Sequence, residues 1–109
     1  MAFDEKLAQR IRQRLRQRAG VTEKKMFGGI AFLVRGNMCC GVHGPDLIVR
    51  LSPEHTDRAL SAPHTRAFDL TGRLMKGWIL VGPKGRATDA QLGKWVGVAT
   101  EYAESLPAK

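Results

Sequence analysis

The chain has 109 residues, of which 43% are hydrophobic and 26% are charged, and its formal net charge is +8. This length supports one hydrophobic core, so we expect a single domain over residues 1–109. No apolar run approaches the roughly 18 residues that span a bilayer, and the N-terminus lacks an apolar h-region and a small-residue cleavage site. These features exclude an integral membrane protein and argue against secretion. Two adjacent cysteines are not a disulfide framework, so a cytoplasmic location is expected.

Positive charge is concentrated near the N-terminus. Residues 1–25 contain eight Lys and Arg against three acidic residues, whereas residues 26–109 contain ten against seven. A basic chain favours nucleic acid, an anionic membrane or an acidic protein as its partner. Phe3, Leu7, Ile11 and Leu15 recur every four residues and predict a helix over residues 3–18. Because this short apolar stripe should pack on the rest of the domain, a membrane-surface role is not expected.

The basic side chains of this helix do not form one face. At about 100° per residue, its arginines flank both sides of the apolar stripe. Contact with phosphates needs clustered charge but no special geometry, so these residues are the candidate surface for nucleic acid or an acidic protein partner. The alternative is a solvated helix whose basic side chains have no specific role. The candidate residues are Arg10, Arg12, Arg14, Arg16, Arg18, Lys24 and Lys25.

Three β-rich segments follow, joined by short turns. Ile30–Arg35 and Met38–His43 are predicted strands connected by a two-residue turn at Gly36-Asn37. Leu47–Leu51 is a third predicted strand, after the turn signal Gly44-Pro45.

The double glycine and the adjacent cysteines are the two candidate chemical sites of this region. A phosphate cradle needs its glycines to open a helix, whereas Gly28-Gly29 precedes a strand, so a bend or bulge is expected there. With Gly36-Asn37 as the turn, Val34 lies opposite Cys39, and Cys39 and Cys40 point to opposite faces of the sheet. In that arrangement the cysteines neither hold one metal ion nor form a disulfide easily, so no metal site or cofactor is expected.

This register places Cys40 on an apolar face with Ala31, Leu33, Met38 and Val42, and Cys39 on a mixed face. With a two-residue second turn, Cys39 lies opposite Arg50 and His43 lies opposite Asp46. A neighbouring cation lowers the pKa of a thiol, so Cys39 is a candidate reactive thiol. The Cys39/Arg50/His43 face is the basis of an alternative function, a small-molecule-sensing or thiol-dependent domain. Cys39 and His43 are about 13 Å apart along the strand, too far for a nucleophile–base pair, so no catalytic residue is assigned and a buried cysteine is the other interpretation.

Residues 52–81 are predicted to form a short helix followed by a strand. Ser52-Pro53-Glu54 supplies an N-cap, a first-position proline and an acidic first turn, and the helix should end near Ser61. His55 is expected to be a surface or capping group. Pro63–Gly72 is predicted to be irregular or edge structure, and Leu74–Val81 is a predicted strand.

A capping box from Thr88 to Gln91 opens the final helix, whose apolar stripe is the strongest periodicity in the chain. Gly93 and Gly97 lie elsewhere on this helix and indicate either close backbone approach by another element or no specific role, and a homodimer through them is a separate alternative. The element order is α-β-β-β-α-β-α. The fold class is therefore α+β, with an antiparallel sheet of about four to five strands on which an N-terminal and a long C-terminal helix pack.

Three segments of the sequence resemble a known family. They are MFGGIAFLVRGNMCCGV, PHTRAFDLTGRLMKGWILV and WVGVATEYAESLP. In order and spacing they resemble the N-terminal domain of the TfoX/Sxy family of bacterial competence regulators, most specifically at Met26-Phe27-Gly28-Gly29 and Met75-Lys76-Gly77-Trp78. Full-length members continue into a C-terminal helical domain. This chain ends directly after its predicted final helix, so a stand-alone N-terminal-type domain is expected.

The resemblance implies a role in transcription regulation. Full-length members act as positive regulators of DNA-uptake genes, in concert with a cyclic-AMP receptor protein at promoters. The family offers no catalytic residues, so the resemblance and the missing catalytic geometry together predict a non-enzymatic regulatory domain. Its expected partner is a regulatory protein or nucleic acid, bound through the basic N-terminal helix, and a homodimer is a further alternative.

Overall fold

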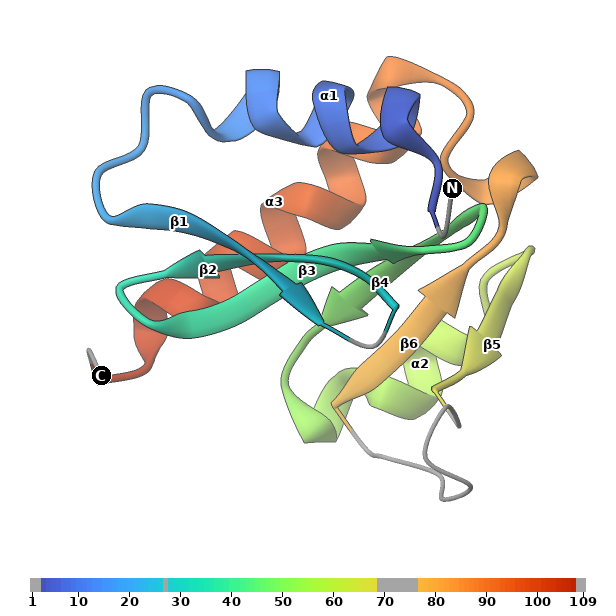
Figure 1. Ribbon diagram of the computed structural model, residues 1–109. Coiled ribbons are helices and arrows are strands. Elements are labelled where there is room, and N and C mark those ends of the chain that lie inside the picture. Colours follow the sequence, from blue (N-terminus) through green and yellow to red (C-terminus); the bar gives the residue numbers. More distant parts are fainter. Residues whose placement is uncertain (1–2, 27, 69–76, 108–109) are drawn as a thin grey trace.

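The computed structural model describes residues 3–26, 28–68 and 77–107, and these contain six strands in one sheet (Figure 1). The order across the sheet is β1-β2-β3-β4-β6-β5, and every neighbouring pair is antiparallel. The α+β class and the element order are as predicted, with six strands where four to five were expected. The strands are β1 (Val21–Met26), β2 (Gly29–Val34), β3 (Asn37–His43), β4 (Asp46–Arg50), β5 (Thr65–Ala67) and β6 (Trp78–Val81).

The α-helices of the described residues share one face of the sheet. The helical segments are α1 (Glu5–Leu15), the 3-10 turn η1 (Pro53–His55), α2 (Thr56–Leu60), the 3-10 turn η2 (Pro83–Gly85) and α3 (Asp89–Ser105). Leu7 and Ile11 of α1 and Trp95 of α3 pack in one buried cluster with strand side chains, and Ala59 and Leu60 of α2 pack against it. In Figure 1, α1 (blue) and α3 (orange to red) cross the same side of the sheet.

The helix α1 is shorter at both ends than the predicted helix over residues 3–18. Its N-cap is Asp4, whose carboxylate accepts hydrogen bonds from the backbone N–H groups of Lys6 (2.9 Å) and Leu7 (3.1 Å). Phe3 precedes the helix and forms an isolated β-bridge with Gly44, while its side chain still packs against the core. The four-residue periodicity therefore included one residue that is partly buried beside a β-bridge and does not belong to the helix.

The turn between β2 and β3 lies one residue earlier than predicted. Its central residues are Arg35 and Gly36, with φ of 50° and 85°, and Val34 pairs with Asn37. Positive φ at both central positions suits a two-residue hairpin, because the turn then matches the twist of the strands. Asn37 lies outside the turn, and its Nδ2 donates a 2.8 Å hydrogen bond to the carbonyl oxygen of Pro107. A contact with a residue distant in sequence thus accompanies the shifted register.

A β-bulge in β3 accompanies this register. Leu33 pairs with Met38 and Phe32 pairs with Cys40, which leaves Cys39 as an extra residue without a partner on β2. The prediction that Cys39 and Cys40 face opposite sides of the sheet is therefore wrong. The bulge interrupts the alternation of side chains, and both cysteines lie in the buried cluster beneath the helices.

The bulge also changes the composition of the two faces. Ala31, Leu33 and Met38 were predicted to share a face with Cys40, but they belong to a separate apolar cluster on the other face of the sheet. The β3–β4 hairpin has the predicted register, with His43 opposite Asp46. The second cluster consists of Ala31, Met38, Ile48, Phe68 and Leu80, with Leu33 and Trp78 packed against it.

The strands β1 and β5 form the two edges of the sheet. β1 was not predicted, because its sequence VTEKKM has no alternating apolar pattern and its side chains from Thr22 to Lys25 are exposed. β5 lies inside Pro63–Gly72, the segment predicted to be irregular or edge structure. Of the predicted strand Leu74–Val81, the part Trp78–Val81 is β6. Residues 69–72 and 74–76 of these predictions lie outside the described residues.

The predicted short helix after Ser52 and the predicted C-terminal helix are both present. The capping box of α3 is formed as predicted, with two 3.1 Å hydrogen bonds that join Thr88 N to Gln91 Oε1 and Gln91 N to Thr88 Oγ1. Ser52 is the N-cap of η1 but makes no capping hydrogen bond, so Pro53 at the first position is the feature that begins this segment. Among the described residues, none of the helices has the length and apolar character of a membrane-spanning segment.

Candidate functional site

Two arginines of α1 bind the segment that leads into α3. Arg10 donates hydrogen bonds to the carbonyl oxygens of Arg86 (3.3 Å) and Ala87 (3.1 Å), and it forms an ion pair with Asp89 (3.2 Å). Arg14 donates a 2.6 Å hydrogen bond to the carbonyl oxygen of Asp89. These two side chains fasten the helix α1 to the start of α3.

Arg12 and Arg18 are held by carboxylates from other elements. Arg12 Nε lies 2.8 Å from a carboxylate oxygen of Glu23 on β1, and this hydrogen bond raises the pKa of Arg12. Arg18 Nη1 lies 3.0 and 2.9 Å from the two carboxylate oxygens of Glu104 on α3. As predicted, the arginines do not form one face of α1. Four of the five candidate arginines bind other parts of the domain through hydrogen bonds or ion pairs.

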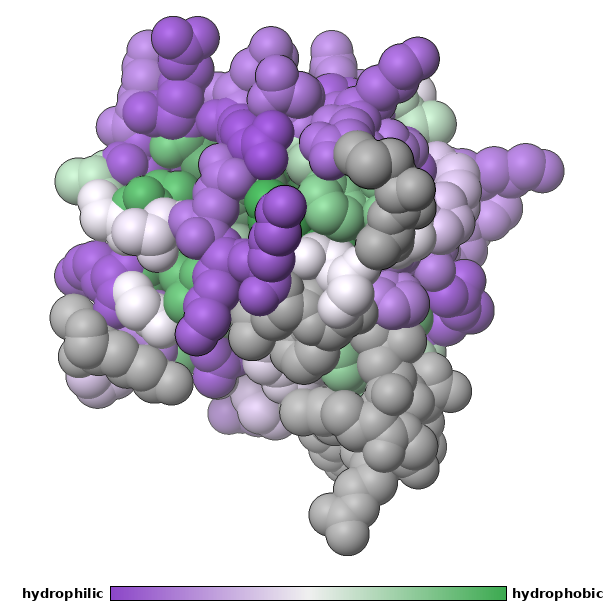
Figure 2. All heavy atoms as spheres, in the orientation of Figure 1, coloured by the Kyte–Doolittle hydropathy of each residue, from purple (hydrophilic) through white to green (hydrophobic). Residues whose placement is uncertain are grey.

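Three of the candidate basic residues extend from the surface without such a partner. Arg16 directly follows α1, and Lys24 and Lys25 lie on β1; all three are exposed, and their side chains make no hydrogen bond or ion pair within the described part of the chain. We call Arg16, Lys24 and Lys25 the open basic residues. Lys24 pairs with Ala31 and Lys25 with Ile30, so the two lysines point to opposite faces of the edge strand. In Figure 2, hydrophilic side chains cover the part of the molecule that Figure 1 shows as α1.

The cysteines form a close pair. The Sγ atoms of Cys39 and Cys40 are 3.7 Å apart, and Cys39 Sγ lies 3.4 Å from the carbonyl oxygen of Phe32. Both side chains are 0% exposed. The hydrogen bond with Cys40 lowers the pKa of the Cys39 thiol, although burial opposes this shift. The same hydrogen bond and burial raise the pKa of Cys40.

The predicted Cys39/Arg50/His43 face is not assembled. Cys39 lies in the core beneath the helices, and the cation that lowers its pKa is Arg18. The Arg50 guanidinium lies 5.2 Å from the ring centre of Trp78 and 5.6 Å from that of Tyr102. His43 lies at the far end of β3. The reactivity of Cys39 stays a prediction. The group that would favour its thiolate is the neighbouring thiol of Cys40 and not the guanidinium of Arg50.

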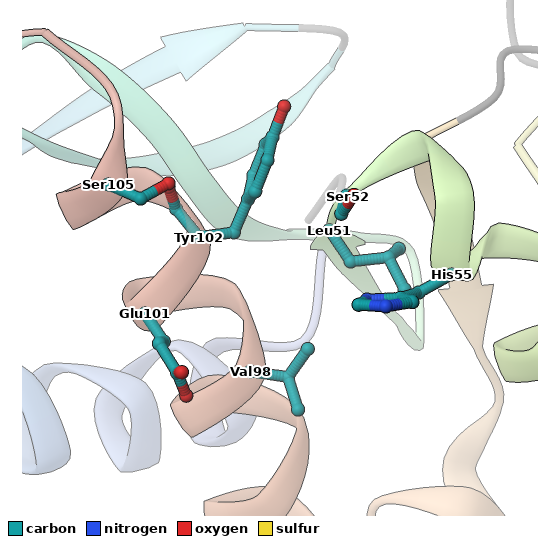
Figure 3. A pocket seen from close by; sticks show the side chains of 7 residues that line it. All are labelled: Leu51, Ser52, His55, Val98, Glu101, Tyr102 and Ser105. Carbon is teal, nitrogen blue, oxygen red and sulfur yellow. The ribbon is translucent and has the colours of Figure 1, made fainter.

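A cavity of about 350 Å³ lies between α3 and the start of η1 (Figure 3). Its apolar part is Leu51 and Val98, and Val98 is 36% exposed. The side chains of His55 and Glu101 stand on opposite walls and make no hydrogen bond or ion pair within the described residues. The complete lining is Leu51, Ser52, His55, Val98, Glu101, Tyr102 and Ser105.

A second cavity of about 320 Å³ shares Leu51, His55 and Val98 with the first and continues along α3 to Lys94. Sequence patterns do not indicate this site, because its walls are separate helices that meet only in the folded chain. His55 was assigned to the surface, which its exposure confirms, without any indication of a cavity beside it. Among the described residues, no group of three or more His, Cys, Asp or Glu could hold a metal ion.

The chain matches the family described as the TfoX N-terminal domain over residues 13–103. This range contains the open basic residues, the cysteine pair, all six strands of the described sheet and most of α3. No curated protein and no solved structure matches the chain.

Proposed function

Because the chain belongs to the TfoX N-terminal domain family, we propose that it is a non-enzymatic regulatory domain that binds nucleic acid through its open basic residues. The observation that carries the proposal is that Arg16, Lys24 and Lys25 are exposed cations whose side chains have no partner among the described residues, in a chain of net charge +8. A part in the transcription of DNA-uptake genes, in a bacterial cytoplasm, belongs to the same proposal and follows from the resemblance to competence regulators.

The distinction between open and engaged cations supports this assignment. To bind a phosphate, Arg12 or Arg18 must first leave a carboxylate at 2.8 or 2.9 Å. The loss of that ion pair offsets part of the free energy gained from the phosphate contact. The open basic residues lose no such contact. Each phosphate that they neutralise releases condensed counterions, which gives an affinity that falls steeply with salt.

The test is the salt dependence of binding to a short DNA duplex. A variant with Arg16→Gln, Lys24→Gln and Lys25→Gln is compared with a control that carries Arg58→Gln, Lys84→Gln and Lys94→Gln, three exposed cations elsewhere. Both variants lose the same charge. If the open basic residues contact three phosphates, the first variant should lower the slope of log affinity against log salt by about 2.7, at about 0.9 per phosphate, and the control should leave it unchanged.

Two outcomes would refute this function. The first is that the unmodified protein shows no binding to DNA or RNA at low salt. The second is an equal loss of slope in both variants, which would mean that net charge alone and not these three positions determines binding.

A second candidate function is small-molecule sensing, favoured by the cavity between η1 and α3. Its volume of about 350 Å³ falls in the range of ligand sites, and it combines apolar walls with the polar groups of His55, Glu101 and Tyr102. None of Cys39, Arg50 and His43 lines it. A metabolite screen followed by NMR should then move the signals of Val98 and Glu101. A screen in which no compound moves them would remove this candidate.

A further inference from the structure

The β-bulge in β3 has a chemical consequence for the two cysteines. In a regular strand, neighbouring side chains point to opposite faces, which would separate the thiols by the thickness of the sheet. Here the extra residue Cys39 places both side chains in the cluster under the helices, with their Sγ atoms 3.7 Å apart. Bulges recur in proteins as features that redirect a side chain.

The distance between the sulfur atoms is short enough for a bond to form by side-chain rotation. A disulfide has a sulfur–sulfur distance of about 2.05 Å, so the two Sγ atoms must approach by about 1.7 Å. Their Cα atoms are about 3.8 Å apart across one peptide bond, less than the usual 4.4–6.8 Å of disulfides. The resulting small ring is strained, and strained disulfides are the ones that are readily reduced again.

We propose that Cys39 and Cys40 are a reversible dithiol–disulfide pair whose oxidant is a peroxide and whose reductant is a small dithiol. The site is distinct from the open basic residues and does not depend on nucleic-acid binding. Its geometry rests on the bulge, on the 3.7 Å approach of the sulfur atoms and on the position of both in one cluster.

The reaction has two steps. The thiolate of Cys39, which the neighbouring thiol of Cys40 favours, attacks one peroxide oxygen; the oxygen–oxygen bond breaks and gives a sulfenic acid on Cys39 and hydroxide. The hydroxide then takes the proton of Cys40, and the Cys40 sulfur attacks the sulfenic sulfur of Cys39. The disulfide forms, and the second peroxide oxygen leaves as hydroxide. This hydroxide becomes water with the proton that Cys39 had lost. The two thiols lose two electrons and two protons, and the peroxide becomes two hydroxyl products, two waters in the case of hydrogen peroxide.

Access to the buried thiols requires local opening of the β2–β3 end of the sheet. Both side chains are 0% exposed, so a small oxidant reaches them only when contacts above them release. Cys39 is two residues from the start of β3, where Asn37 binds Pro107 at 2.8 Å and Arg35 binds the carbonyl oxygen of Glu104 at 2.7 Å. These polar contacts tie the turn to the end of α3, and their release is the expected route.

The test is intact-mass spectrometry of the folded protein after treatment with hydrogen peroxide. The expected product is a monomer that has lost two hydrogen atoms and regains them with dithiothreitol. Trypsin places both cysteines in one peptide, residues 36–50, which also contains Met38. Peptide sequencing therefore separates the disulfide, a loss of two hydrogens, from a methionine sulfoxide, a gain of one oxygen. Cys39→Ala and Cys40→Ala are the single-thiol controls and should never show the loss of hydrogens.

Two results for the unmodified protein would overturn the proposal, and neither requires a variant to fold. One is that both thiols stay reduced until the protein is unfolded in urea. The other is that they are oxidised only to oxygen adducts or to disulfides between chains.

A matched pair of variants tests whether the oxidant reaches the thiols by local opening near Asn37. Asn37→Ala removes a partly buried 2.8 Å hydrogen bond close to the thiols, whereas Thr56→Ala removes a buried 2.7 Å hydrogen bond from the N–H of Gly77 at the α2 end. Asn37→Ala should accelerate disulfide formation several-fold more than Thr56→Ala. Equal acceleration by both would place access in global unfolding and would contradict reaction in the folded state.

Discussion

Asn37 and Asp4 each join two parts of the chain that are far apart in sequence. The buried amide of Asn37 holds Pro107 beyond the end of α3, and the turn shifts to Arg35 and Gly36. The carboxylate of Asp4 caps α1 and also accepts a 3.2 Å hydrogen bond from Arg86, whose side chain is only 11% exposed. A single polar side chain thus determines a local structure and a tertiary contact at once.

The role of Asp4 gives a prediction about pH. The backbone hydrogen bond from Leu7, assisted by Arg86, lowers the pKa of Asp4. A group whose pKa is lowered by folding stabilises the fold above its unfolded pKa, and this contribution disappears as the pH falls through the folded pKa. Asp4→Asn, which keeps the capping oxygen, should therefore cost about 0.5–1 kcal/mol at neutral pH and low salt and nothing once Asp4 is protonated.

Urea unfolding of both proteins at a series of pH values measures this difference. Asp57→Asn, at an exposed position, controls for the removal of one negative charge. A difference between Asp4→Asn and the unmodified protein that persists unchanged at the lowest pH would contradict the role of the Asp4 charge.

At the scale of elements, α1 and α3 approach each other over a glycine. A Cβ atom on Gly93 would lie 2.8 Å from Nη1 of Arg14, the side chain that donates to the carbonyl oxygen of Asp89. A Cβ atom on Gly97 would meet no atom of the described residues within 4 Å. Another element therefore does approach Gly93 closely, through the side chain of Arg14. A homodimer through α3 stays a prediction.

The two glycines should respond differently to substitution. Gly97→Ala should stabilise the protein by about 0.5–1 kcal/mol, because alanine favours a helix and the position is open. Gly93→Ala should gain less, since the new methyl group displaces Arg14 from Asp89. Thermal unfolding of Gly93→Ala in an Arg14→Ala background completes the double-mutant cycle. In that background Gly93→Ala should stabilise the protein by the full amount expected for Gly→Ala in a helix. Additive effects of Gly93→Ala and Arg14→Ala would contradict the contact.

At the scale of the whole molecule, elements with a long periodic sequence pattern could be predicted, whereas features that depend on tertiary contacts could not. The capping box and apolar stripe of α3 and the register of the β3–β4 hairpin are local properties of the sequence, and the structure confirms them. β1 has no apolar alternation because its side chains are exposed at an edge, so only its pairing with β2 defines it. The bulge at Cys39 accompanies a turn whose position depends on a distant contact of Asn37.

The candidate site shows the same division. Charge clustering near the N-terminus identified seven basic residues, but the sequence does not reveal which of them have acidic partners. Glu23, Asp89 and Glu104 lie on three different elements, and only the folded chain brings them to Arg12, Arg10 and Arg18. The structure thereby reduces seven candidates to three open basic residues.

The most direct test of the proposed function is an NMR titration of the isotope-labelled protein with a short DNA duplex at low salt. The account predicts that amide signals at and beside Arg16, Lys24 and Lys25 shift as DNA is added and return as salt is raised. Signals around Val98 and Glu101, in the cavity beside α3, should stay in place. Shifts confined to the cavity, or no shift at any site, would contradict the account.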